Sequence, residues 1–164
     1  SEPNMTDNIT TAQRSRLMSR VRAKNTNPEI AVRRTAHALG LRFRLHSRDL
    51  PGTPDLVFPR WRIVVFVHGC FWHRHEGCRK ASMPASRTKF WAEKFAANVE
   101  RDARTRAALL QAGWSPVVIW ECETKTPNEL REIVRQRVMR EAAEFVANSD
   151  RRRYESTKAG DGEA

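Results

Sequence analysis

The chain has 164 residues, of which 40% are hydrophobic, and its 30 Lys and Arg against 19 Asp and Glu give a formal net charge of +11. This length predicts one domain around one core. No apolar run approaches the ~20 residues of a membrane-spanning helix, and the N-terminal sequence has no secretory apolar segment, so we expect an intracellular protein without a membrane partner. Three cysteines cannot pair evenly into disulfides, so they are free thiols or metal ligands.

The positive charge is concentrated near the N-terminus. Between Thr10 and Arg48 the sequence has ten basic residues and one acidic residue, Glu29. Arginine dominates this set, and because its guanidinium suits phosphate groups, the charge favours nucleic acid as the partner over a solvated basic face without one. The arginines of the N-terminal segment that we expect to contact nucleic acid are Arg14, Arg16 and Arg20.

The first half of the chain is predicted to contain helices followed by short strands. A basic helix is predicted from about residue 10 to 21. Asn27 as N-cap, Pro28 in the first turn and Gly40 after the end predict a second helix over 28–39. The strands that follow are predicted near 41–46 and 55–58, around the turn at 50–54, and at 61–67, where the sequence is β-branched and aromatic.

The second half is predicted to begin with a loop rich in His, Cys and Trp at 68–86, followed by a long helix at 88–111. The residues expected on one buried face of this helix are Phe95, Val99 and Leu110. A strand at 116–120 should be buried on both sides, since its apolar run does not alternate, and a last helix is predicted at 128–146.

This order of elements predicts an α/β fold with a small mixed sheet flanked by helices. The predicted organisation is a basic N-terminal arm with a short helix at 1–27, a core domain at 28–147 and a polar tail at 148–164 that we expect to be disordered.

Four potential metal ligands lie close to one another or to the end of a predicted strand. They are Cys70, His75, Cys78 and Cys122. Thiolate and imidazole donors in a set of four suit tetrahedral Zn²⁺, and four protein ligands indicate a closed, structural site. The alternative is three ordinary thiols and a surface histidine. Because the loop has little apolar content of its own, we predict a zinc ion that ties it to the sheet.

A second pattern concerns phosphodiester hydrolysis. Metal-dependent nucleases often place an Asp on one strand and an acid-x-Lys pair on the next, and the carboxylates hold Mg²⁺. Here Asp55 enters a predicted strand, while Phe66 and His68 take the places of the acid and the Lys on one face of the next strand. The backbone carbonyl of Val67 is then a second oxygen for the ion. Taken alone the pattern is weak, because an Asp after a turn is more often a turn residue.

Three aromatic residues lie in or near the His- and Cys-rich loop. They are Phe71, Trp72 and Trp91. Large exposed aromatics in a basic protein can wedge between bases. The alternative is that they cap the core, which for Trp91 is as good an interpretation as the wedge.

Taken together, these motifs resemble the very short patch repair (Vsr) DNA mismatch endonuclease family. The resemblance runs in order from about Arg14 to Cys122. The strings that carry it are Leu-Pro-Gly-Thr-Pro-Asp at 50–55, Phe-Val-His-Gly-Cys-Phe-Trp-His at 66–73, Arg-Thr-Lys-Phe-Trp at 87–91, Asn-Val-Glu-Arg-Asp at 98–102, Gly-Trp at 113–114 and Val-Ile-Trp-Glu-Cys at 118–122.

The resemblance implies a restriction-endonuclease-like fold with a structural zinc and assigns roles to named residues. Asp55 and the Val67 carbonyl match the Mg²⁺ site, His68 and His73 the active-site histidines, and Glu29 a catalytic glutamate, which we expect to position His73. The four potential zinc ligands match the family's set, and the three aromatics match residues that enter DNA from the major groove. Met18 matches an arm residue on the minor-groove side.

The activity implied is Mg²⁺-dependent nicking of double-stranded DNA next to a T:G mismatch, which leaves 3′-hydroxyl and 5′-phosphate ends. We expect a monomer in the bacterial cytoplasm, associated with the nucleoid and linked in function to a cytosine methyltransferase and to mismatch repair proteins. Two departures from the family pattern are Val67, where Thr is typical, and a 73–78 segment that is less His-rich and one residue longer.

Three alternatives stay open at this point. One is a nuclease of the same fold with another target, such as a site-specific nickase or a modified-DNA endonuclease. Another is a catalytically silent, zinc-bearing DNA-binding protein, and the third is a general RNA-binding protein.

Overall fold

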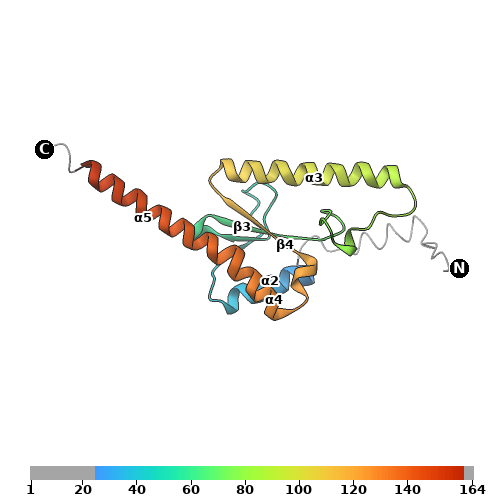
Figure 1. Ribbon diagram of the computed structural model, residues 1–164, viewed down its shortest axis with the longest axis horizontal. Helices are drawn as coiled ribbons and strands as arrows, with labels where there is room; N and C mark the ends of the chain where they lie inside the picture. The colour runs from blue at the N-terminus through green and yellow to red at the C-terminus, as the bar shows by residue number, and fades with distance from the viewer. Residues whose placement is uncertain (1–24, 161–164) are drawn as a thin grey trace.

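The computed structural model describes residues 25–160, which form one four-stranded sheet with helices on both faces (Figure 1). The strands are β1 (Arg44–Leu45), β2 (Leu56–Phe58), β3 (Ile63–His68) and β4 (Ser115–Trp120). The main helices are α2 (Asn27–Ala38), α3 (Thr88–Gln111), α4 (Pro127–Val134) and α5 (Arg140–Gly160). The predicted α/β class with a mixed sheet is therefore confirmed.

The sheet has the strand order β1-β2-β3-β4. β2 pairs antiparallel with both β1 and β3, whereas β3 pairs parallel with β4 along its whole length, from Ile63 opposite Ser115 to His68 opposite Trp120. The parallel pair requires a crossover, which α3 supplies. Because parallel strands end at the same edge of the sheet, His68 and Trp120 lie side by side. The active-site loop, which is the His-, Cys- and Trp-rich segment after β3, begins at this edge.

Side-chain alternation along the strands divides the core in two. One cluster packs between the sheet and α2, α4 and α5, and includes Leu56, Ile63, Val65, Val117 and Ile119. The other lies on the α3 side and includes Val57, Val64, Phe66 and Leu109. Figure 1 shows α3 on one side of the sheet and α2, α4 and the beginning of α5 on the opposite side, and α5 then continues beyond the sheet. The expectation that residues 116–120 are buried on both sides is corrected, since Val117 and Ile119 are buried and Val118 is only partly so.

Two helices differ from their predicted form in ways that affect the site. The N-cap of α2 is Thr26, whose hydroxyl accepts from the Glu29 backbone N–H, so Asn27 is the first helical residue rather than the cap. The buried face of α3 consists of Trp91, Phe95 and Leu109, whereas Val99 and Leu110 are about half exposed, at 48% and 52%. This face of α3 is buried because it packs against the sheet and against Phe71 and Trp72 in the loop after β3.

The last predicted helix is divided and extended. A π-helical turn at Arg135–Met139 separates α4 from α5, and α5 continues to Gly160, whereas the sequence predicted a disordered tail from residue 148. This segment has no proline and carries helix-compatible contacts, including the Lys158 ammonium over the Tyr154 ring. No helix among residues 25–160 is long and apolar enough to cross a membrane.

Candidate active site and metal centre

The four predicted zinc ligands converge on one point. The donor atoms of Cys70, His75, Cys78 and Cys122 all lie within 4.8 Å of one another. His75 Nδ1 lies 3.6 Å from Cys70 Sγ and 3.4 Å from Cys122 Sγ. Three thiols and one imidazole nitrogen at this spacing fit tetrahedral Zn²⁺.

The loop is folded around this cluster by its own backbone. His75 N–H donates to the Cys70 carbonyl at 3.0 Å, and Cys78 N–H donates to the His75 carbonyl at 3.2 Å. The His75 ring also stacks on Trp120 at the end of β4, with centroids 4.2 Å apart. Burial raises the pKa of Cys122 to about 12, and the neighbouring Cys70 thiol adds to the shift. Without a cation the Cys122 thiol therefore keeps its proton, and a divalent metal among the three sulfur atoms would favour the thiolate form.

Asp55 lies at the start of β2, beside β3. Its Oδ2 accepts a hydrogen bond of 2.7 Å from the Val67 backbone N–H, so the predicted pair of Mg²⁺ ligands is adjacent. The turn that carries Asp55 packs closely on α3, because a Cβ at Gly52, whose φ is +72°, would lie 2.4 Å from Thr105 Cγ2. The Asp55 side chain is thus held by the β3 backbone, and the turn that precedes Asp55 lies against α3.

Burial raises the pKa of Asp55 from 3.8 to about 6, and the hydrogen bond from Val67 only partly opposes the shift. The folded protein therefore holds this proton more tightly than the unfolded chain does, so stability falls as pH rises from about 4 to about 6.

We expect Asp55→Asn to raise the free energy of unfolding by roughly 1–3 kcal/mol at pH 8 without added Mg²⁺, and by about half as much at pH 5. Urea unfolding at both pH values measures this, and an unchanged or lower stability at pH 8 would contradict it.

The two predicted histidines stack on each other, with ring centroids 3.8 Å apart and planes 6° from parallel. Burial, followed by the neighbouring His73, lowers the pKa of His68 to about 4, so His68 is neutral at neutral pH. His73 Nδ1 lies 2.6 Å from Asp102 Oδ2 on α3. This hydrogen bond fixes the orientation of the His73 ring and leaves its Nε2 available.

The sequence-based prediction for the partner of His73 was wrong. Glu29 does not bond to His73 but to His46 and Arg33, at 3.2 and 3.1 Å. Asp102 takes the predicted place of Glu29. Asp102 was missed as a site residue because it is one charged residue among many on an exposed helix, although it ends the Asn-Val-Glu-Arg-Asp string at 98–102.

The predicted wedge residues form an aromatic cluster with the N-terminal part of α3. Phe71 contacts Trp72, Trp91 and Phe95 edge to face, at centroid distances of 5.1, 5.7 and 5.1 Å. Phe71 and Trp72 are partly exposed, whereas Trp91 is only 5% exposed, which favours the core interpretation for Trp91 in this structure. Asn98 donates to the Trp72 carbonyl at 3.1 Å and ties the loop to α3.

A single cleft joins these groups. Its lining includes Glu29, Asp55, His68, Trp72, His73 and Asp102. The volume is about 1170 Å³, above the roughly 300–1,000 Å³ of typical small-molecule sites, which suits a larger substrate. The predicted DNA contacts Arg14, Arg16, Met18 and Arg20 lie outside the described residues.

Comparisons with known proteins show the family of the chain. The family model described as DNA mismatch endonuclease Vsr matches residues 6–80. The type II nicking enzyme V.XorIIP of Xanthomonas oryzae pv. oryzae is 56% identical over 73% of this chain and 87% of its own. The DNA mismatch endonuclease Vsr of Escherichia coli is 40% identical over 74% of this chain and 77% of its own. The chain belongs to the Vsr endonuclease family.

A further relative is matched over its own whole length. The type II nicking enzyme V.NmeAIP of Neisseria meningitidis is 40% identical over 87% of this chain and 100% of the relative. Membership of the Vsr family makes the chain a DNA endonuclease.

Proposed function

We propose that this Vsr-family endonuclease nicks double-stranded DNA next to a T:G mismatch, with Mg²⁺ as the catalytic ion, and leaves 3′-hydroxyl and 5′-phosphate ends. The observation that carries the proposal is the single cleft that joins Asp55, the stacked histidines and Trp72. The Vsr relative named a DNA mismatch endonuclease supports the mismatch as target.

The reaction is assigned to residues of this cleft. Mg²⁺ bound through Asp55 and the Val67 carbonyl would stabilise charge on the phosphate and the leaving oxygen. His73 accepts a proton from the attacking water at Nε2, because its Nδ1 is engaged with Asp102. Neutral His68 stacks against His73 and keeps its ring in place.

Selectivity for a mismatch comes from the cost of opening the base stack. A T:G pair is less well fitted than a Watson–Crick pair, so prying it open costs less. Phe71 and Trp72 are the partly exposed aromatics next to His73. Zinc held by Cys70, His75, Cys78 and Cys122 would fix the loop that carries both, so that insertion at a deformed site and placement of His73 would occur together.

A nicking assay tests the reaction itself. We expect cleavage of one strand of a duplex in Mg²⁺, none in EDTA and none of single-stranded DNA, and the product should be ligatable because it carries a 5′-phosphate and a 3′-hydroxyl. Cleavage that persists in EDTA, or a product that ligase cannot seal, would contradict the proposed chemistry.

Trp72→Ala should reduce discrimination between T:G and T:A duplexes. Stacking of an aromatic side chain on a base is worth roughly 1–3 kcal/mol, and this gain is available only where the stack opens. We therefore expect binding to T:G DNA to weaken about 5- to 150-fold, while T:A binding, carried by phosphate contacts, changes little. Fluorescence anisotropy at fixed salt measures both affinities.

Trp61→Ala is the matched control for this variant. Trp61 packs against the core on the opposite face of the sheet from α3, so its loss should leave the T:G to T:A ratio unchanged. If Trp72→Ala weakened binding to the T:G and T:A duplexes equally, Trp72 would be a core residue or a general DNA contact. The proposed role of Trp72 as a wedge would then be wrong.

A further inference from the structure

Glu29 is buried in a way that requires partners. Its exposure is 3%, and it is the one buried charged residue among residues 25–160. An ionised carboxylate with so little contact with water is costly unless it is paired and hydrogen-bonded. The groups around Glu29 therefore decide its orientation.

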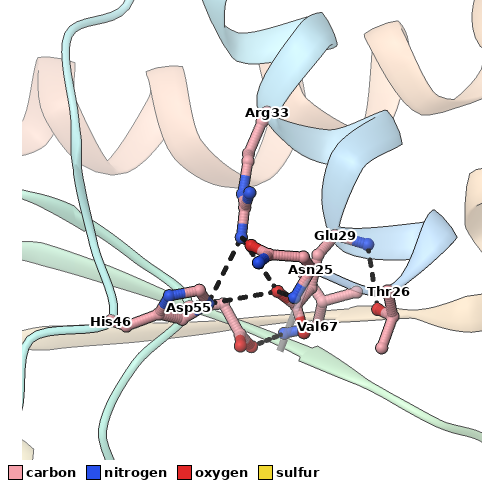
Figure 2. A network of polar contacts seen from close by, with 7 residues as sticks. All are labelled: Asn25, Thr26, Glu29, Arg33, His46, Asp55 and Val67. Atoms are coloured by element: carbon pink, nitrogen blue, oxygen red, sulfur yellow. Dashed lines mark hydrogen bonds and ion pairs between the residues drawn. The ribbon is translucent and has the colours of Figure 1, made fainter. Parts of the chain in front are cut away.

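Three nitrogen atoms surround one oxygen of this carboxylate. Glu29 Oε2 lies 3.0 Å from the Asn25 backbone N–H, 3.1 Å from Arg33 Nη2 and 3.2 Å from His46 Nε2 (Figure 2). Because an ionised carboxylate only accepts, the His46 contact is a hydrogen bond when Nε2 carries the proton. Arg33 Nη2 and His46 Nε2 lie 3.3 Å apart, and with the proton on Nε2 they are two donors that share one acceptor.

The other oxygen, Oε1, accepts no hydrogen bond from any group of residues 25–160. Glu29 lines the cleft together with Asp55. One atom each of Glu29, His46 and Asp55 lie within 4.8 Å of one another. With three donors on Oε2, the orientation of the carboxylate is fixed, and among the described residues Oε1 is the oxygen left for a further donor in the cleft that Glu29 shares with Asp55.

We infer that Arg33 and His46 are positioning residues that hold Glu29 so that Oε1 accepts a hydrogen bond from water beside Asp55. The inference rests on the proposed function, because it assumes that Asp55 and Glu29 serve the nuclease reaction. Neither Arg33 nor His46 touches the reacting atoms in this account. Each acts through Glu29.

The two residues are well anchored for this purpose. Arg33 Nη2 also donates to the Asn25 side chain at 2.9 Å, and the Arg33 side chain is 17% exposed. His46 has a left-handed backbone, with φ of 44°, and its N–H donates to the Asp55 carbonyl at 3.3 Å. The backbone that places His46 against Glu29 is therefore bonded directly to the residue that would hold the ion.

A double-mutant cycle tests the inference in the full-length protein. Single-turnover nicking of a T:G duplex in Mg²⁺ should fall roughly 10- to 100-fold in Arg33→Met and in His46→Ala, because each removes a hydrogen bond to a charged group. In a Glu29→Gln background the same changes should cost less than about twofold, because both act through Glu29. His46→Gln, whose amide can donate to Oε2, should retain most of the activity.

Matched controls lie on the same helix. Arg34 and His37 are exposed residues of α2, so Arg34→Met and His37→Ala remove the same side-chain types without touching Glu29. Both should nick at the wild-type rate. Thermal melting checks the fold, and if Arg33→Met does not fold, Arg33→Lys, which keeps the charge but lacks the planar fork, replaces it in the cycle.

A second readout does not depend on activity. Nitrogen-15 correlation spectra of the imidazole side chains report which ring nitrogen carries the proton, and we expect His46 to carry it on Nε2 in the wild-type protein. A His46 ring that carries its proton only on Nδ1 would overturn the inference. So would a fall in the nicking rate from Arg33→Met and His46→Ala that is as large in the Glu29→Gln background as in the wild-type protein.

The experiment also separates this inference from the proposed function. Asp55→Asn that nicks like the wild-type protein would remove the proposed active site and this inference with it. Inactive Asp55→Asn together with fully active Arg33→Met and His46→Ala would leave the nuclease assignment in place and remove only the positioning role.

Discussion

Asp55→Ala is expected to lower the nicking rate at least about a thousandfold, because the metal ion contributes several kcal/mol of transition-state stabilisation and Asp55 is its proposed carboxylate ligand. Binding to DNA should stay close to that of the wild-type protein, since phosphate contacts of the basic residues carry most of the affinity of a protein with net charge +11. Single-turnover nicking in Mg²⁺ and anisotropy in EDTA measure the two quantities separately.

Asp49→Ala is the control for the loss of a carboxylate. Asp49 is exposed in the same turn region, so removing it changes the net charge equally without touching the cleft. It should nick at the wild-type rate. If Asp55→Ala retained Mg²⁺-dependent nicking comparable to Asp49→Ala, the active site would lie elsewhere and the pairing of Asp55 with the Val67 backbone would have no catalytic meaning.

Cys122→Ala should release zinc and unfold the active-site loop. Cys122 is the proposed ligand that lies just after β4, whereas the other three proposed ligands lie in the loop itself, so its loss should detach the loop from the sheet. Structural zinc binding is coupled to folding, and we expect a loss of at least about 3 kcal/mol in the free energy of unfolding together with loss of nicking. Elemental analysis and chemical denaturation measure both.

His75→Cys is the matched variant, because it exchanges one zinc donor for another. It should keep one zinc per chain and most of the stability. Wild-type protein purified without chelators that contained no zinc, or a Cys122→Ala variant as stable as the wild type, would show that the four residues form no metal site.

Local sequence patterns predicted which residues the fold brings together where these residues lie close to one another in the chain. Three of the four proposed zinc ligands fall within nine residues of one another, at 70–78, and side-chain alternation placed Phe66 and His68 on one face of β3 with Val67 on the other. The parallel pairing of β3 with β4 then brings Cys122 to the loop. The resemblance to the Vsr family supplied the assignments of His73 and Glu29.

The partners of the charged residues could not be predicted, because they depend on tertiary packing. Asp102 and Arg33 are ordinary charged residues on helices, and His46 is a lone histidine near a short strand. Only the fold shows that Asp102 faces His73 and that Arg33 and His46 share one oxygen of Glu29. The extent of α5 was also missed, because a charged helix with few buried positions has a composition close to that of a disordered tail.

The most direct test of the proposed function is the ratio of single-turnover nicking rates on T:G and T:A duplexes of the same sequence. In Mg²⁺ and at equal salt, the wild-type protein should cut the T:G duplex at least about a hundredfold faster than the T:A duplex, because the mismatch lowers the cost of opening the base stack by a few kcal/mol. Equal rates on the two duplexes would contradict mismatch repair as the function and identify the protein as a nickase with another target.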